Sequence, residues 1–302
     1  MLSRIAPGLF VLLWSTGFLA TKLGSTGAEP FTFLVVRFIA VLAVLVPAAL
    51  WFKPSALGSS GRMHAMVVGV LMYTTYLGGV MWAMRAGMGS SVAALIVSLQ
   101  PVLTAALAGA FLGEVISKRQ WAGIVLGLAG AGLVIGPRLQ TQATLDIGSG
   151  ISPATILATT LALLGITLGT IYQKRFATGG SLLSGAIWQY VGALGAMLPL
   201  AYLFERGHIE WTPAVAGALA WLVLVLSIGA MGLLMLLIRE NAVSGITGLF
   251  YLVPGVTALM SFGLFAETLS PTQLAGLVVV TVAVVLMQPG RAKTGTDPIA
   301  AP

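Results

Sequence analysis

The sequence contains no cysteine, only two histidines and only eight acidic residues among its 302 positions. Without cysteine there are no disulfides, no thiol catalysis and no cysteine metal sites. His64 and His208 fall in segments that we interpret as loops, and no pair of carboxylates lies inside an apolar run. Acid–base or metal chemistry of an intramembrane enzyme needs such groups. We therefore expect no enzymatic activity, no cofactor and no metal.

Charge is the second shortage, because only 8% of the residues are charged and 58% are hydrophobic. A soluble domain would be about a quarter charged. The charges divide the chain into ten long uncharged runs: 5–21, 38–52, 63–84, 86–113, 120–137, 147–173, 176–204, 211–238, 241–266 and 268–290. A membrane-spanning helix needs roughly 20 apolar residues, and nine of the runs are long enough. The remaining run, 38–52, becomes long enough if the helix begins near Phe31 and includes Arg37. Since runs such as 278–286 do not alternate in polarity, a β-barrel is disfavoured.

Two similar segments, residues 90–135 and 243–288, lie in opposite halves of the chain. A shift of 153 positions places Ser91 on Ser244, Leu99 on Leu252, Pro101 on Pro254, Thr104 on Thr257, Glu114 on Glu267 and Gln120 on Gln273. Five predicted spans separate the copies, and an odd number turns the second copy over. The sequence thus predicts an all-α polytopic membrane protein, with ten transmembrane helices in two inverted five-helix repeats, 1–146 and 147–290, followed by a disordered cytoplasmic tail, 291–302. Inverted repeats are typical of transporters that alternate access to a central site.

The distribution of lysine and arginine predicts the orientation. With the N-terminus inside, ten basic residues lie at cytoplasmic ends: Arg4, Lys53, Arg62, Lys118, Arg119, Lys174, Arg175, Arg239, Arg291 and Lys293. Four lie outside: Lys22, Arg85, Arg138 and Arg206. Because positive charge concentrates in cytoplasmic loops, we expect both termini in the cytoplasm. The net charge of +7 then faces anionic lipid rather than nucleic acid.

Helix starts and close helix contacts have signatures of their own. Ser117–Gln120 and Ser270–Gln273 both have the capping-box form Ser-x-x-Gln, while Ser152-Pro153 and Thr212-Pro213 are two further predicted starts. Glycines four apart, such as Gly165 and Gly169, let helix backbones approach closely in lipid. We interpret them as packing within the monomer, with a homodimer seam as the alternative.

Short motifs in a fixed order resemble a known family. Residues 13–22, Leu-Trp-Ser-Thr-Gly-Phe-Leu-Ala-Thr-Lys, are similar to the first-helix signature of EamA-type transporters in the drug/metabolite transporter superfamily, and Arg37-Phe38 is similar to their second-helix pair. The end of span 4 and the start of span 5 also resemble this family, in Leu112-Gly113-Glu114 and residues 120–123. The second half repeats this motif in residues 265–267 and 273–276. The resemblance implies ten helices in a bacterial inner membrane, export or exchange of a small organic molecule, and a cavity lined mostly by spans 1, 3, 4, 6, 8 and 9. Small multidrug relatives have a glutamate roughly where this chain has Trp14, so a proton-carrying carboxylate of that type is absent.

Two prolines related by the repeat, Pro101 and Pro254, fall near the middle of spans 4 and 9. Each removes a helical hydrogen bond and frees a carbonyl four residues earlier, which a membrane tolerates where it lines a wet cavity. We expect a helix break used in gating or binding, with a simple packing kink as the alternative. Uncharged polar residues flank the two prolines and are candidates for substrate binding: Ser98, Gln100, Tyr251 and Thr257.

Further cavity candidates lie in the first three spans. Arg37 is the only charge inside a span; an intramembrane charge is a functional candidate by default, although Arg37 is also near enough to the outer end to anchor the helix by reaching the interface. Trp14, Ser15, Tyr73 and Tyr76 are expected in the cavity, where the rings would stack on a substrate or bind a cation. Core packing is the alternative for these four.

Glu114 and Glu267 form an acidic pair at equivalent helix ends. Pairing with a neighbouring lysine or arginine is the simpler interpretation, and a role in gating is the alternative. Together the patterns predict a secondary transporter that exports or exchanges a small metabolite such as an amino acid by alternating access. No Gly-x-x-x-x-Gly-Lys-[Ser/Thr] loop is present, so ATP is not expected to drive it directly. A non-transporting membrane receptor or an assembly subunit is the alternative.

Overall fold

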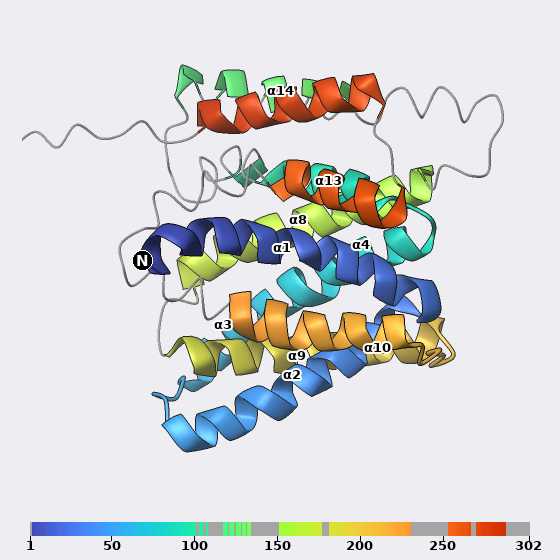
Figure 1. The fold of residues 1–302 in the computed structure, drawn as a ribbon. Coiled ribbons are helices and arrows are strands. Elements are labelled where there is room, and N and C mark those ends of the chain that lie inside the picture. Colours follow the sequence, from blue (N-terminus) through green and yellow to red (C-terminus); the bar gives the residue numbers. More distant parts are fainter. Residues whose placement is uncertain are drawn as a thin grey trace, which may run out of the picture.

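The computed structural model describes residues 2–100, 151–176, 181–230, 253–266 and 270–287, and sixteen further residues scattered between 103 and 133 (Figure 1). Within these residues the backbone is helical apart from short connections. The only β-type pairing in this part of the chain is a single antiparallel bridge between Ala28 and Ile209. The all-α prediction is therefore confirmed for the described residues.

The described elements follow the predicted spans in order. They are α1 (Leu2–Gly27), α2 (Pro30–Phe52), α3 (Ser59–Gly69), the π-helix η1 (Val70–Thr75), α4 (Tyr76–Arg85), α5 (Ser90–Val97), α8 (Pro153–Phe176), α9 (Leu182–Phe204), α10 (Pro213–Ala220), the π-helix η2 (Trp221–Ala230), α13 (Val253–Phe265) and α14 (Pro271–Met287). Five stretches are long and apolar enough to cross a membrane: Pro30–Phe52, Ser59–Arg85, Pro153–Phe176, Leu182–Phe204 and Pro213–Ala230. The arrangement is compatible with ten transmembrane helices in an inverted repeat, which stays a prediction.

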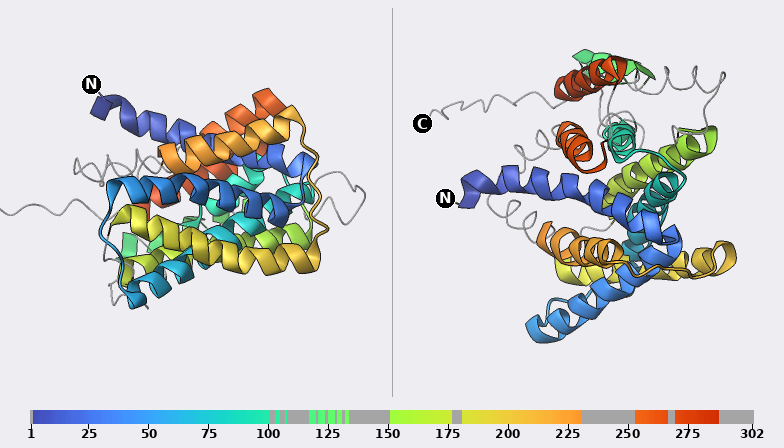
Figure 2. Two further views of the ribbon diagram at one scale, coloured as in Figure 1. Left: turned by 90° about the horizontal axis from the view of Figure 1, so that it is seen from below. Right: turned by 45° about the vertical axis from the view of Figure 1, so that its right-hand side comes forward.

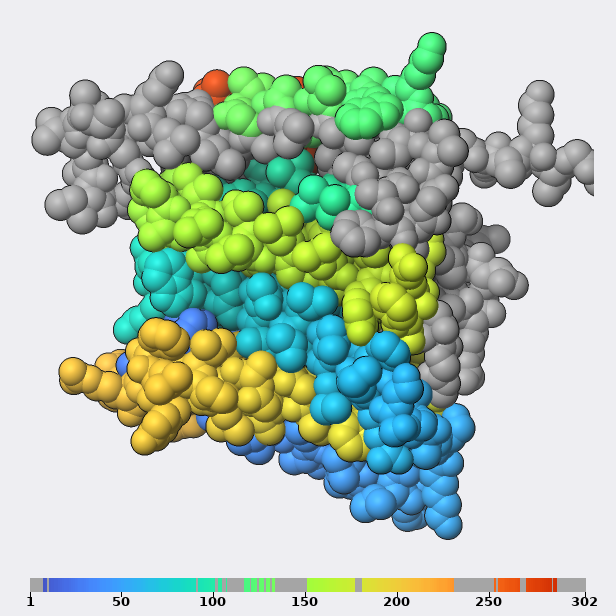
Figure 3. Space-filling model, turned by 180° about the vertical axis from the view of Figure 1, so that it is seen from behind, coloured from blue at the N-terminus to red at the C-terminus, as the bar shows by residue number. Residues whose placement is uncertain are grey.

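The helices lie side by side in a stack, with α2 at one edge and α14 at the other (Figures 1 and 2). Seen from behind, the stack runs from α2 and α3, through α4 and α8, to the helical residues near 120–130 (Figure 3). Bulky apolar side chains face outward on these helices: Trp51 is 83% exposed and Leu259 75% exposed. Such a surface suits surrounding lipid rather than water.

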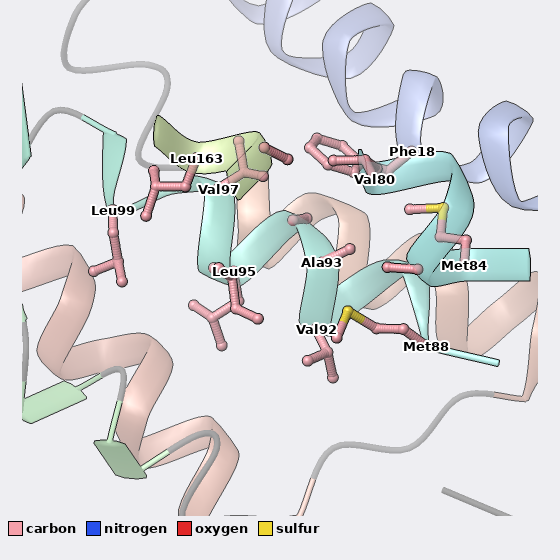
Figure 4. Packing of buried hydrophobic residues seen from close by; sticks show 14 of the residues in the cluster. Phe18, Val80, Met84, Met88, Val92, Ala93, Leu95, Val97, Leu99 and Leu163 are labelled. Carbon is pink, nitrogen blue, oxygen red and sulfur yellow. The ribbon is translucent and has the colours of Figure 1, made fainter. Parts of the chain in front are cut away.

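Two clusters of buried apolar residues hold the stack together. One joins α1, α4, α5, α8 and α13, and Figure 4 shows side chains of four of these helices meeting, among them Phe18, Met84, Leu95 and Leu163. The other joins α1, α2, α9, α10 and η2 around Phe33 and other fully buried residues. Because both clusters include residues from both predicted repeats, the two halves pack against each other rather than as separate bodies.

Close approach of α3 and α9 depends on two glycines. A Cβ atom at Gly69 would overlap the backbone carbonyl of Gln189, and one at Gly192 would overlap the backbone of Met66. The expected close contact at Gly165 is also present, since a Cβ there would lie 2.8 Å from the Leu71 carbonyl oxygen. In lipid, where the hydrophobic effect does not drive helix association, such contacts favour tight packing.

The predicted helix starts are confirmed where the structure describes them. Helix α14 begins with a reciprocal capping box, in which the Ser270 N–H donates to Gln273 Oε1 over 2.9 Å and the Gln273 N–H donates to Ser270 Oγ over 3.3 Å. Helix α10 begins at Pro213, and Thr212 Oγ1 accepts the Val215 N–H over 3.2 Å. The box at 117–120 includes Gln120, which lies outside the described residues.

The loop assignment of His64 is wrong. His64 lies in α3, its Nδ1 is 2.9 Å from the Tyr172 hydroxyl, and its ring stacks on Phe176 at 5.4 Å. The helix begins at Ser59, so the charged residue Arg62 lies inside α3 and does not mark a loop. His208 does lie in a connection, between α9 and α10, and its side chain is 66% exposed.

Candidate substrate cavity

A cavity of about 370 Å³ lies inside the stack. Its lining comes from α1, α2, the continuous α3–η1–α4 segment, α8, α9 and η2. It extends from Thr21 and Leu34, near the end of the molecule where α1 joins α2, to Leu57 and Phe176, near the opposite end. Apolar side chains predominate in the lining, and a small number of polar groups converge on it, which is the usual composition of a site for a small organic ligand.

Two π-helices border this cavity, one from each predicted repeat. Met72 and Tyr73 of η1 and Leu226 and Ser227 of η2 all line it. The predicted repeat shift moves Val70–Thr75 onto 223–228, which lies inside η2. A π stretch turns the side chains after it relative to those before it, and such stretches occur frequently at functional sites. Here both stretches orient polar side chains toward the same space.

Arg37 reaches this cavity from α2 and is buried, with 6% of its surface exposed. One Nη atom donates to Ser227 Oγ over 3.2 Å, and Nε has no hydrogen-bond partner. Among the described residues no carboxylate lies within ion-pair distance of the guanidinium. A buried charge without a counter-ion is costly, so this arrangement leaves room for an anionic group from a ligand.

Aromatic rings stand beside Arg37. Tyr73 of η1 and Tyr190 of α9 are stacked, with centroids 4.5 Å apart and planes 14° apart. Phe38 packs edge-on against Tyr190 at 5.7 Å. The Tyr73 hydroxyl donates to Gln189 Oε1 over 3.1 Å, which fixes the ring and the amide together. The result is a rigid wall that offers an aromatic face and polar tips next to a positive charge.

The chain has counterparts among known transporters. Residues 8–136 match the model of the EamA-like transporter family. This chain carries an EamA-like transporter domain. That match lies inside the first predicted repeat.

Similar proteins of comparable length support the assignment. The EamA-like chain is 27% identical to YedA, an uncharacterized inner membrane transporter of Escherichia coli (strain K12), over 96% of this chain and 92% of YedA. It is 25% identical to a probable amino-acid metabolite efflux pump of Salmonella typhimurium, over 90% of each chain. One crystal structure resembles it with a TM-score of 0.59 at 19% identity, covering 94% of this chain and 95% of that one, which shows likeness of fold. The EamA-like chain is thus an integral membrane transporter of small molecules rather than an enzyme.

Four of the candidate substrate-binding residues line the cavity: Trp14, Arg37, Tyr73 and Tyr76. Trp14 and Tyr76 complete the wall on the side of α1 and α4. The structure brings these four residues together from three different helical segments. Their contact with substrate stays a prediction.

Four other candidates do not line this cavity. Three of them form hydrogen bonds with other parts of the protein, and the fourth is buried without a partner. Ser15 is fully buried against α13 and its Oγ donates to the Val253 carbonyl over 3.4 Å. Ser98 Oγ donates to the Leu95 carbonyl over 2.6 Å. The Gln100 amide donates to Thr170 Oγ1 over 3.2 Å, between α8 and the segment after α5. Thr257 is fully buried and its Oγ1 has no partner.

The remaining candidates cannot be placed. Tyr251, Pro101, Glu114 and Glu267 lie outside the described residues. The backbone of Pro254 is helical, but α13 is described only from Val253, so the helix break expected before this proline also lies outside. The gating roles of both prolines and of the acidic pair stay predictions.

Two helices that were not among the predicted lining helices supply several residues of the cavity lining. Spans 2 and 7, which correspond to α2 and α9, supply Arg37, Gln189 and Tyr190, whereas the described residues of spans 4 and 9 do not reach this cavity. The sequence held one signal for span 7, the polar and aromatic triplet Trp188-Gln189-Tyr190 within an apolar run. Ser227 gave no signal, because one serine in an apolar span is commonplace.

Proposed function

We propose that the protein is a secondary transporter that exports or exchanges a small metabolite bearing a carboxylate, such as an amino acid, by alternating access. The observation that carries this proposal is the buried guanidinium of Arg37, which lines the cavity with its Nε unpartnered. Relatives named as transporters, one of them as a probable amino-acid metabolite efflux pump, support the class of activity.

A carboxylate is the group that best matches Arg37. Guanidinium and carboxylate form short, charge-assisted hydrogen bonds, which are often bidentate. In the apolar cavity the pair gains strength because water does not screen it. No carboxylate of the described residues pairs with this guanidinium, so a carboxylate substrate would supply the counter-ion that the buried charge otherwise lacks.

The rest of the substrate would lie along the aromatic wall. Tyr73 and Tyr190 provide a flat surface for an apolar or planar portion, and the Gln189 amide stands beside it for a polar group. A cavity of about 370 Å³ suits a small organic molecule.

The inverted repeat supplies the mechanism. Two five-helix halves of opposite orientation rock against each other, so that the cavity opens to one side of the membrane and then to the other. We place the protein in a bacterial inner membrane with both termini in the cytoplasm, where the basic residues of the loops concentrate.

Counterflow in proteoliposomes tests the proposal. Vesicles loaded with an unlabelled amino acid should accumulate the labelled form, and the Arg37→Gln variant should lose about 30-fold or more in apparent affinity, as expected when one partner of a desolvated charge pair is removed. Lys53→Gln is the matched control, because it removes the same charge from the exposed end of the same helix. Absence of counterflow across a broad panel of carboxylate metabolites would contradict the proposal.

A further inference from the structure

Two connections from different halves of the chain meet at one end of the cavity. One is the short link between α1 and α2, and the other is the link between α9 and α10. Glu205, at the end of α9, accepts the Phe31 N–H on Oε1 over 2.8 Å and both the Thr32 N–H and the Thr32 hydroxyl on Oε2 over 2.7 and 2.8 Å. This carboxylate therefore caps the first turn of α2, whose own preceding residue makes no side-chain cap.

Glu29 binds in the opposite direction. Its Oε2 accepts the backbone N–H groups of Arg206 and His208 over 2.9 and 2.8 Å. The backbones add a Glu29 N–H to His208 carbonyl bond of 3.1 Å and a Glu210 N–H to Gly27 carbonyl bond of 2.7 Å. Gly207, with φ of +77°, provides the left-handed turn that points successive N–H groups at the Glu29 carboxylate. We name residues 27–32 and 205–210 together the Glu29–Glu205 clasp.

The clasp lies at the α1–α2 end of the cavity and joins the two predicted repeats there. Leu34, which lines the cavity, follows the clasp residue Thr32 by less than one helical turn, and Thr21 precedes Gly27 by under two turns. On the first-repeat side, Arg85 of α4 donates to the carbonyls of Ser25 and Thr26 over 3.2 and 2.8 Å, so the end of α1 is itself fixed. The hydrogen bonds between the two sides are thus among the contacts that must break if the halves separate at this end.

These bonds suit a reversible closure. They are hydrogen bonds from N–H and O–H groups to carboxylates, two of them exposed, and water can take over these partners when the bonds break.

We infer that the Glu29–Glu205 clasp is the gate of the cavity at the α1–α2 end, closed in this structure and broken once in each transport cycle. The inference rests on the proposed function, because only a protein that alternates access needs to break these bonds. It assigns a role to two carboxylates that do not contact the substrate.

Thiol labelling tests the gate without any substrate. The chain contains no cysteine, so Thr21→Cys introduces one unique thiol in the cavity near the clasp. In Glu205→Gln one accepting oxygen becomes an NH₂ group, which cannot accept a backbone N–H, so the bond to either Phe31 or Thr32 is lost. A membrane-impermeant maleimide added at the clasp side should label this variant roughly tenfold faster than the parent, since charge-assisted bonds that held the closed state are lost.

Glu210→Gln is the matched control, because Glu210 lies in the same connection but its carboxylate pairs with His208 of that connection, at 3.6 Å. Its labelling rate should equal that of the parent. Equal labelling of the Glu205→Gln variant and the parent would overturn the gate.

A disulfide across the clasp gives a second, opposite test. Ala28 and Ile209 are paired across an antiparallel bridge, where Cα atoms lie about 4.5–5.5 Å apart, within the range that a disulfide needs. In Ala28→Cys/Ile209→Cys, oxidation should abolish counterflow and reduction should restore it, while each single variant stays active. Full counterflow with the disulfide intact would overturn the gate.

The two tests separate this inference from the proposed function. The labelling rates depend on the clasp alone, so faster labelling of Glu205→Gln supports the gate even if no carboxylate metabolite is transported. Conversely, counterflow that depends on Arg37 and persists across an intact 28–209 disulfide supports the proposed function and overturns the gate.

Discussion

The two ends of the α2–α9 pair are held by different chemistry. At the end where α2 begins and α9 finishes, Glu29 and Glu205 accept hydrogen bonds from the opposite connection. At the other end, where α2 finishes and α9 begins, the bond that the structure shows between the connections is a neutral one, from Ser184 Oγ to the Ser55 carbonyl over 2.9 Å. In the predicted inverted repeat these ends would be equivalent. The bonding thus differs at two ends that the predicted repeat would make equivalent.

This difference indicates which state the protein favours. Hydrogen bonds to a carboxylate are roughly twice as strong as neutral ones, so the pair is held more firmly at the clasp end. A transporter built this way rests with that end closed, and substrate binding must offset the loss of the clasp before the cavity opens there.

The largest effect is expected from Glu205→Ala, which removes the acceptor of three hydrogen bonds and the cap of α2. The variant should lose about 2 kcal/mol of unfolding free energy. Reversible unfolding in mixed detergent micelles measures this. A loss no larger than that of Ser184→Ala would remove the difference between the two ends.

Glu29→Ala should destabilise the protein less than Glu205→Ala does. It removes the acceptor of two backbone N–H groups instead of three donors, and the backbone bonds between residues 27–29 and 208–210 remain. The same unfolding experiment ranks the two variants. A reversed order would place the main contact of the clasp on Glu29.

Ser184→Ala, at the opposite end, should cost about 0.5–1 kcal/mol, the usual worth of a neutral hydrogen bond. It should also leave the labelling of Thr21→Cys from the clasp side unchanged. Faster labelling would mean that the two ends do not open independently.

The smallest effect should be that of pH on Glu29. The hydrogen bond from the His208 N–H lowers the pKa of Glu29 below its usual value of 4.5. The hydrogen bonds from the backbones of Arg206 and Gly207 and the charge of His208 lower this pKa further, while desolvation by slight burial raises it. Because the pKa is lower in the clasped state, the contribution of the carboxylate is present above about pH 4.5 and is lost as the pH falls through the clasped-state pKa. The difference in melting temperature between wild type and Glu29→Gln should therefore shrink below about pH 4.5. A difference that does not change with pH would show that the Glu29 charge does not stabilise the clasp.

Much of the fold follows from the sequence because local features determine it. Uncharged runs mark the helices, and Pro213 and the Ser270–Gln273 box mark where two of them begin. Arg37 stands out as a candidate because it is the only charge inside a predicted span, and in the structure it lines the cavity. These signals lie within a few residues of the feature that they predict.

Features that depend on distant partners escaped prediction. The clasp joins Glu29 to a segment about 177 positions later, and in the sequence both of its glutamates look like ordinary loop carboxylates. The stacking of Tyr73 on Tyr190 depends on how α9 packs against η1. In the π-helices η1 and η2 the backbone hydrogen bonds join residues five apart instead of four, and no pattern in the amino-acid sequence marks this change.

The central claim is that Arg37 holds the carboxylate of the substrate, and one binding comparison tests it most directly. The affinity of wild type and of Arg37→Gln is measured for a transported acid and for its amide, which has the same shape without the charge. Wild type should prefer the acid by about 30-fold or more, and the variant should bind the two nearly equally. The same preference for the acid in both proteins would contradict the account.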